Sequence, residues 1–171
     1  MGIFNFSKKS NVQSDSACAM TWNELAKQLM TWYRDVEVLD RECLVIPVSG
    51  FHCYVRHHPK KAFLSVETAW RLNPEDISSF QDLAVFCNDS NRAFLSKVFV
   101  LQYEYEGEKV MDLCIVKEIP FFDSITAVAI NQKLLELVAD NGDIMAEFNR
   151  RFPSQQDSAK KAEALQTEKN I

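Results

Sequence analysis

Alternation of apolar and polar positions is clearest between residues 94 and 121, where it predicts two long strands joined by a turn. In the first segment, residues 94–105, the odd-numbered positions are apolar or aromatic except for Lys97. In the second segment, residues 109–119, most odd-numbered positions are again apolar. Successive side chains of a strand point to opposite faces, so each segment has one apolar row that can line a core.

The turn between these strands decides which side chains face each other. A three-residue loop, Tyr105-Glu106-Gly107, with glycine in the left-handed conformation, would place the two odd-numbered rows on the same face of the sheet. It would set Leu101 opposite Met111 and Phe99 opposite Leu113. We therefore expect the odd-numbered rows to face the core.

The even-numbered face of the same hairpin is also apolar, which is unusual for a sheet with one solvated side. It carries Val98, Val100, Val110, Cys114 and Val116 beside polar residues. A helix or crossing loop of the same chain could cover this patch. Alternatively, a partner chain covers it, because contiguous exposed apolar surface commonly marks an interaction site. These five residues are candidates for a partner or dimer surface.

A capping box, Thr21-Trp22-Asn23-Glu24, predicts the start of the first helix. Apolar residues then follow helical spacing to about residue 36. Trp22 and Trp32 lie on this apolar face, and core packing is the default explanation for both. Tryptophan is also enriched among interface residues that dominate binding, so both join the candidate partner surface.

The remaining pattern completes an α+β domain. Three segments predict a meander: residues 43–48, which are short and interrupted by Pro47, and residues 51–56 and 64–72, which alternate. A second helix is expected to open with Asn73 as its cap and Pro74 at its first position. A third helix is expected after the hairpin, capped by Asp123 or Ser124, with a stop at Asp140-Asn141-Gly142 and a shorter helix from residue 143. The predicted order is helix, three strands, helix, two strands, helix, with an antiparallel sheet and helices mainly on one face.

The ends of the chain differ in composition from this domain. Residues 1–20 are mostly small and polar, and we expect a flexible leader. The domain spans residues 21–152, and residues 153–171 are expected to form a disordered or marginally helical tail. The leader lacks the long apolar region of a secretory signal. Its aromatic residues followed by Lys8 and Lys9 allow at most a weak membrane contact.

Overall composition narrows the class of partner and the compartment. The chain has 171 residues, of which 47% are hydrophobic and 11% aromatic, enough for one buried core. The net charge of −5 argues against a dedicated nucleic-acid binder, whose footprint would be a basic stripe. Five cysteines without a C-x-x-C spacing favour reduced thiols in a cytoplasmic protein.

Residues with catalytic or metal-binding chemistry do not form a recognisable motif. The densest group of potential ligands is His52, Cys53, His57 and His58. On one strand, His52 and His58 would lie about 20 Å apart, which is too far for one metal ion. Four glycines leave no phosphate-binding loop, and no nucleophile motif is present. We therefore expect no catalytic residues, no metal and no cofactor.

One stretch carries a resemblance to a known family. The segment Leu83-Ala-Val-Phe-Cys-Asn88-Asp-Ser-Asn91-Arg92 resembles the helix end of the YbjN-like family of bacterial proteins, with two asparagines and an arginine before a strand, a glycine turn and a second strand. This family is similar in fold to the type III secretion chaperones. The resemblance covers about residues 21–152. It implies a non-enzymatic chaperone-like or regulatory protein that binds another polypeptide and can form a homodimer. Asn88 and Asn91 could equally be simple helix caps.

These observations favour a cytoplasmic α+β protein that binds a partner polypeptide through apolar sheet or helix surface. Two alternatives remain open. One is a small-ligand sensor or enzyme with a pocket between sheet and helices, and the other is an immunity protein that neutralises a toxin. The sequence does not identify the partner.

Overall fold

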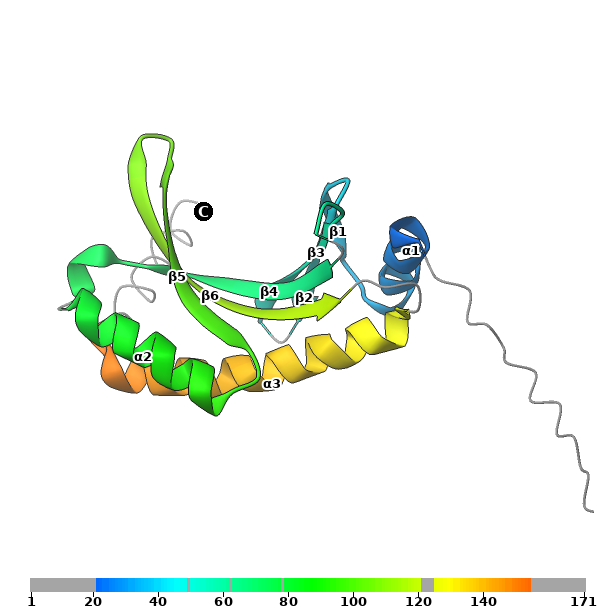
Figure 1. Ribbon diagram of the computed structural model, residues 1–171. Coiled ribbons are helices and arrows are strands. Elements are labelled where there is room, and N and C mark those ends of the chain that lie inside the picture. The colour runs from blue at the N-terminus through cyan, green and yellow to red at the C-terminus, as the bar shows by residue number, and fades with distance from the viewer. Residues whose placement is uncertain (1–20, 49, 62, 78, 121–124, 155–171) are drawn as a thin grey trace, which may run out of the picture.

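The structure, a computed structural model, describes residues 21–48, 50–61, 63–77, 79–120 and 125–154. These residues form a six-stranded antiparallel sheet with α-helices on one side (Figure 1). The elements are α1 (Trp22–Trp32), β1 (Glu37–Asp40), β2 (Cys43–Val48), β3 (Phe51–His58), β4 (Phe63–Leu72), the short 3-10 helix η1 (Pro74–Asp76), α2 (Phe80–Ala93), β5 (Lys97–Tyr105), β6 (Glu108–Pro120) and α3 (Ala127–Arg151). The predicted α+β fold class is confirmed. The predicted leader and nearly all of the predicted tail lie outside the described residues.

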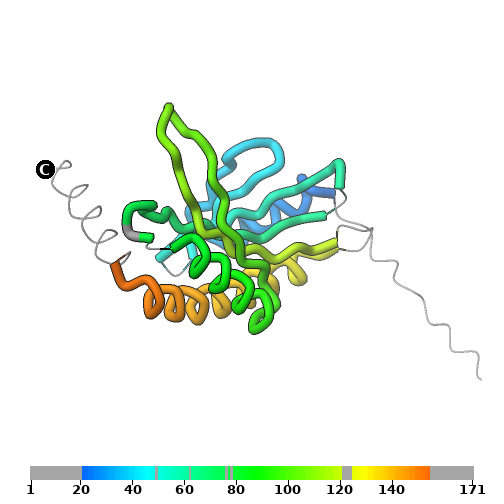
Figure 2. The backbone as a smooth tube through the Cα atoms, turned by 60° about the vertical axis from the view of Figure 1, so that its left-hand side comes forward, coloured from blue at the N-terminus to red at the C-terminus, as the bar shows by residue number. Residues whose placement is uncertain are grey.

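The order of strands places β5 at one edge of the sheet. Neighbouring strands follow the order β1-β2-β3-β4-β6-β5, and every pair is antiparallel. The first four strands form a meander, and the β5–β6 hairpin joins it through β6. Figures 1 and 2 show α2 and α3 on one side of the sheet, while the tip of the hairpin rises away from them.

The core lies between the sheet and the helices. Leu25 and Leu29 of the capped helix α1 belong to the same buried cluster as residues of α2, α3 and the sheet. The cluster's fully or almost fully buried members include Leu44, Ile46, Cys53, Val55, Leu64, Val66, Phe86, Val98, Leu113, Ile115, Ile130, Leu134, Leu137, Ile144 and Phe148. We call this side of the sheet the core face and the opposite side the outer face. Among the described residues, no helix covers the outer face. Of the apolar patch predicted on the even-numbered face of the hairpin, Val98 and Val100 lie on the core face beside α2, and the other three residues lie on the outer face.

The first helix is shorter than predicted, and a strand follows it. Apolar spacing predicted a helix to about residue 36, but α1 ends at Trp32 and Asp35 adopts a left-handed backbone conformation with φ of 57°. Val36 still packs against the core. Strand β1 was not predicted because all its residues are exposed, so it has no buried row to produce alternation.

The second helix begins later than predicted. Asn73 caps only η1, where its Oδ1 accepts a hydrogen bond from the amide of Glu75. Ser79 is the cap of α2, and its Oγ accepts a hydrogen bond from the amide of Asp82 at 3.2 Å. Phe80 is exposed at the start of α2.

The predicted stop at Gly142 is wrong, because α3 continues unbroken through it. Asn141 is buried, and its side-chain oxygen accepts a hydrogen bond from the indole of Trp70 at 2.8 Å. Ile144 and Phe148 beyond the glycine are buried in the core. Tertiary contacts on both sides of Gly142 therefore outweigh the local stop signal. The helix starts at the cap Thr126, and the predicted caps lie outside the described residues.

The hairpin turn also differs from the prediction. Tyr105 pairs with Glu108, so the loop has two residues, Glu106 and Gly107, with φ of 52° and 81°. Positive φ at both central residues is the type I′ conformation, which suits the twist of a hairpin. The shorter loop shifts the pairing by one residue relative to the prediction, and the odd-numbered row of β5 therefore lies on the outer face.

Candidate functional site

Strand β5 has an open edge. In the described part of the chain it pairs only with β6, and the pairing runs from Lys97 to Tyr105 without a register shift. Natural edge strands are usually short, bulged, covered, or interrupted by proline or a central lysine. The only lysine of β5 is its first residue. The strand therefore lacks most of the features that prevent another strand from pairing with it.

The turn determines which backbone groups of β5 point toward this open edge. In a hairpin with a two-residue loop, the pair next to the loop exchanges hydrogen bonds, and bonded and non-bonded pairs then alternate. Tyr105 and the other odd-numbered residues of β5 thus direct their N–H and C=O groups at β6. The even-numbered residues Val98, Val100, Gln102 and Glu104 direct theirs outward.

Asn91 occupies one end of this edge. The amide of Val98 donates to Asn91 Oδ1 at 2.6 Å, and Asn91 Nδ2 donates to the carbonyl of Val98 at 2.9 Å. The asparagine side chain thereby satisfies both groups, as an added strand would. Asn91 is therefore neither a helix cap nor a surface residue without a role. The outward groups of Val100, Gln102 and Glu104 remain along the rest of β5.

A row of apolar and aromatic side chains accompanies the open edge on the outer face. We call Phe99, Leu101, Tyr103 and Tyr105 the aromatic row; they are exposed by 42%, 47%, 37% and 59%. The sequence pattern located these residues but assigned them to the core face. Recognition of Glu106-Gly107 as a two-residue turn would have placed them correctly.

A polar network fixes one member of the aromatic row. The hydroxyl of Tyr103 donates to Asp112 Oδ2 at 2.7 Å, and Arg71 Nε donates to Asp112 Oδ1 at 2.7 Å. The hydrogen bond to Asp112 raises the pKa of Tyr103, and the hydrogen bond from Arg71 to the same carboxylate raises the pKa of Arg71. Tyr103 therefore stays a neutral phenol with a fixed ring orientation.

On the core side, β5 and α2 border a groove. One hollow of about 470 Å³ is lined by residues of both elements, including Phe80, Ala84, Cys87, Val100 and Gln102. A second hollow of about 460 Å³ adjoins it at Phe80 and Gln102 and extends to the hairpin. We call the two together the edge groove. It follows the side of β5 on which an added strand would place every second side chain.

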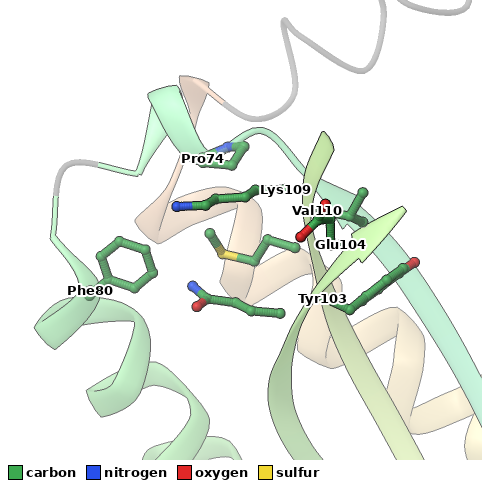
Figure 3. A pocket seen from close by; sticks show the side chains of 8 residues that line it. Pro74, Phe80, Tyr103, Glu104, Lys109 and Val110 are labelled. Carbon is green, nitrogen blue, oxygen red and sulfur yellow. The ribbon is translucent and has the colours of Figure 1, made fainter. Parts of the chain in front are cut away.

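The end of the edge groove near the hairpin combines apolar and charged groups. Figure 3 shows Phe80 facing the hairpin across the hollow, with Pro74 and Lys109 along one side and Glu104 on β5. Glu104 pairs across the hairpin with Lys109. Glutamates 106 and 108 follow on the same hairpin tip, so its charge is negative.

The outer face has a shallower hollow beside the aromatic row. It has a volume of about 380 Å³ and is lined by Tyr54, Phe99, Leu101, Cys114 and further residues. Arg56, which also lines it, donates to Glu67 at 3.1 Å. The charged groups of this surface are paired with each other, which leaves its aromatic side chains as the groups available for contact.

The seven residues predicted for a partner surface lie in three places. Val98 is 1% exposed and Val100 is partly buried, and both are on the core face. The other three strand residues, Val110, Cys114 and Val116, are on the outer face but are buried beneath their neighbours. Trp32 is exposed on α1, and Trp22 is partly buried against the core. The structure therefore does not bring the seven together as one surface.

The histidine and cysteine cluster has structural contacts. His57 stacks on Trp22 with ring centroids 5.5 Å apart, and burial lowers the pKa of His57. His58 is 2.9 Å from the hydroxyl of Ser65, and burial raises the pKa of Cys53 to about 12. Among the described residues, no group of three His, Cys, Asp or Glu side chains is arranged to hold a metal ion. Within the same residues, no helix has both the length and the apolar character needed to span a membrane.

Comparison with known proteins identifies the fold. No protein-family model and no curated protein sequence matches the chain. Among solved structures, YbjN from E. coli, a proposed transcription regulator, aligns with a TM-score of 0.59 and 11% sequence identity, covering 79% of this chain and 96% of YbjN. The chain has a YbjN-like fold. A protein from Methanothermobacter thermautotrophicus aligns with a TM-score of 0.53 and 14% identity, covering 76% of this chain and 98% of the other.

The YbjN-like fold confirms the resemblance seen in the sequence at the level of architecture. Because the alignments cover more than three quarters of this chain and nearly all of both neighbours, the similarity is not limited to one motif. Identities of 11% and 14% carry no residue roles across.

Proposed function

We propose that this protein is a non-enzymatic, chaperone-like or regulatory protein that binds an extended segment of another polypeptide as an added strand on β5. The observation that carries the proposal is the open edge of β5, with outward backbone groups at Val100, Gln102 and Glu104 beside the exposed aromatic row. Strand addition uses main-chain hydrogen bonds for affinity and alternate side chains for specificity.

Both sides of such an added strand would meet a suitable surface. Its outer side chains would contact Phe99, Leu101 and Tyr103, and its inner side chains would enter the edge groove. Fixed aromatic side chains give large contact area at low cost in conformational entropy. A net charge of −5 favours a protein partner over nucleic acid. The proposed regulatory role of YbjN agrees with a binding function, and a cytoplasmic location is part of our proposal.

A substitution can close the edge without disturbing the hairpin. The amide of Gln102 points away from β6, so proline at this position removes an outward donor and leaves the β5–β6 hydrogen bonds in place. The side chain of Gln102 is exposed, so little packing is lost. We expect Gln102→Pro to retain the circular dichroism spectrum and unfolding midpoint of the wild-type protein within a few degrees.

Selection of peptides from a random ten-residue display library tests the proposal. We expect the wild-type protein to enrich peptides with alternating apolar positions, and those peptides to lose binding to Gln102→Pro. On binding, the amides of Val100, Gln102 and Glu104 should become protected from hydrogen exchange. If enriched peptides bind the proline variant equally well, or protect none of these amides, the β5 edge is not the binding site.

A further inference from the structure

We infer that the segment bound on β5 runs antiparallel to it, ends opposite Phe99, carries apolar residues at the two positions facing the edge groove, and has a basic residue beside Glu104. This inference rests on the proposed function and specifies the chemistry of the partner. It also excludes a second copy of this chain as the occupant.

Asn91 sets the end of the added strand. Its side chain already bonds both outward groups of Val98, at 2.6 Å and 2.9 Å. A strand that continued past Phe99 would have to displace these two hydrogen bonds. The added strand therefore pairs with residues 99–105, where its hydrogen-bonded positions are opposite Val100, Gln102 and Glu104. We expect the antiparallel orientation because it gives the more stable pairing and is the one used throughout this sheet.

The groove determines which side chains fit at these positions. Positions opposite Val100 and Gln102 lie next to Phe80, Ala84 and Cys87 of the edge groove. An apolar side chain there loses contact with water at both surfaces, whereas a charged one would be desolvated without a partner. Farther along, Glu104 and the glutamates of the hairpin tip outnumber Lys109. A basic residue opposite Glu104 gives a favourable cross-strand pair.

Self-association by the same edge conflicts with this chemistry. Two β5 strands related by a twofold axis pair symmetrically about one residue. Symmetry about Gln102 would place the partner's Glu104 opposite Val100, inside the apolar groove. Symmetry about Leu101 would place Glu104 opposite Val98, where Asn91 already occupies the edge. Symmetry about Tyr103 would place Glu106 opposite Val100. Each arrangement buries a carboxylate or breaks the Asn91 hydrogen bonds.

A designed peptide tests the inference. The acetylated and amidated peptide Thr-Lys-Thr-Val-Tyr-Val-Thr has lysine opposite Glu104 and valines opposite Gln102 and Val100 when it pairs antiparallel to residues 105–99. Its affinity is measured by NMR titration of the amides of β5, which follows even weak binding. Replacing its lysine with glutamate should weaken binding by about fivefold. The variant Glu104→Lys should reverse that preference.

Backbone methylation provides matched controls with identical side chains. A methyl group on the amide of the peptide's fourth residue, which points at β5, should weaken binding by about tenfold or more, because it removes a hydrogen bond and blocks the edge. A methyl group on the amide of the fifth residue, which points away, should change binding by less than about threefold. Lengthening the peptide beyond the position opposite Phe99 should add no affinity.

The outcomes separate this inference from the proposed function. Binding that depends on the fourth amide but shows no preference for lysine, or improves on lengthening, overturns the inference and leaves strand addition in place. Absence of binding overturns the stated partner chemistry. Binding unaffected by the fourth amide and by Gln102→Pro overturns both. Sedimentation velocity completes the test, since a dimer abolished by Gln102→Pro would make a second copy the occupant and overturn the inference.

Discussion

A buried lysine connects strand β6 to helix α3, and its replacement tests how the sheet and that helix are held together. The side chain of Lys117 is only 5% exposed, and its Nζ lies 2.9 Å from Asp140 Oδ2 and 3.8 Å from Glu136 Oε2. Ser96 Oγ donates to the same oxygen of Asp140 at 2.6 Å. In the sequence, Lys117 interrupts an apolar odd-numbered row, and nothing in that pattern indicates a buried ion pair.

Removing one partner of a buried ion pair costs more than removing the pair. Asp140→Asn keeps the shape of the side chain but leaves the charge of Lys117 poorly compensated, and breaking a buried pair in this way costs about 3 to 5 kcal/mol. We expect the lower end, about 3 kcal/mol, because Glu136 remains nearby. Lys117→Met also removes one partner, but the carboxylate left behind is 21% exposed and keeps its hydrogen bond from Ser96. Because the more deeply buried charge is the one removed, we expect a change within about 1 kcal/mol.

Urea unfolding followed by tryptophan fluorescence measures both variants, and the double variant completes the cycle. We expect the double variant to be more stable than Asp140→Asn alone by about 2 kcal/mol, because the uncompensated charge is gone. If Lys117→Met loses as much stability as Asp140→Asn, the ion pair stabilises the fold by itself and our reasoning on desolvation is wrong. If Asp140→Asn costs less than about 1 kcal/mol, the charge of Lys117 is compensated in another way.

Two further predictions concern backbone conformation and thiol chemistry. Gly107→Ala should destabilise the protein by about 1 kcal/mol through backbone strain, because φ is 81° in the turn and no atom lies within 4 Å of the added carbon. Gly142→Ala, which is equally open but lies in a helix, should instead stabilise the protein by up to about 1 kcal/mol. If thermal unfolding shows that both variants change stability in the same direction, the backbone conformation assigned to one of these glycines is wrong. In a Cys18→Ser background at pH 8, Cys53 should not react with Ellman's reagent until the protein unfolds. Burial raises the pKa of Cys53 to about 12, so only about one Cys53 side chain in ten thousand is a thiolate at this pH. Rapid reaction of Cys53 in the native protein would refute this prediction.

Local signals in the sequence predicted those parts of the fold in which local and tertiary preferences agree. The capping box at Thr21 and Glu24 is present as predicted, with Glu24 Oε2 accepting a hydrogen bond from the amide of Thr21 at 2.8 Å. The three longer strands of the meander were also located, because each has buried side chains on the core face. The stop at Gly142 failed because the buried side chain of Asn141 bonds to Trp70, a residue far away in the sequence. A single contact between residues far apart in the chain produces no periodic pattern of apolar residues in the sequence.

The sequence predicted part of the candidate site. The face of the sheet on which the odd-numbered row of β5 lies was mispredicted, because the observed loop is one residue shorter than the predicted one. The sequence pattern identified two apolar faces on the β5–β6 hairpin, and the structure confirms that both exist. A three-residue loop assigned the odd-numbered row of β5 to the core, whereas the observed two-residue loop places Phe99, Leu101 and Tyr103 on the outer face. Because strand side chains alternate with a period of two, a difference of one residue reverses every assignment along the strand.

The same turn also decides which backbone groups of β5 are open, so it links the fold to the proposed function. With the two-residue loop, the outward groups belong to Val98, Val100, Gln102 and Glu104, and Asn91 is positioned to satisfy those of Val98. With a three-residue loop, outward and inward groups would exchange, and the Asn91 side chain would meet groups already bonded to β6. The paired hydrogen bonds between Asn91 and Val98 are therefore independent structural support for the register, for the open edge beyond Val98, and for the point at which an added strand must end.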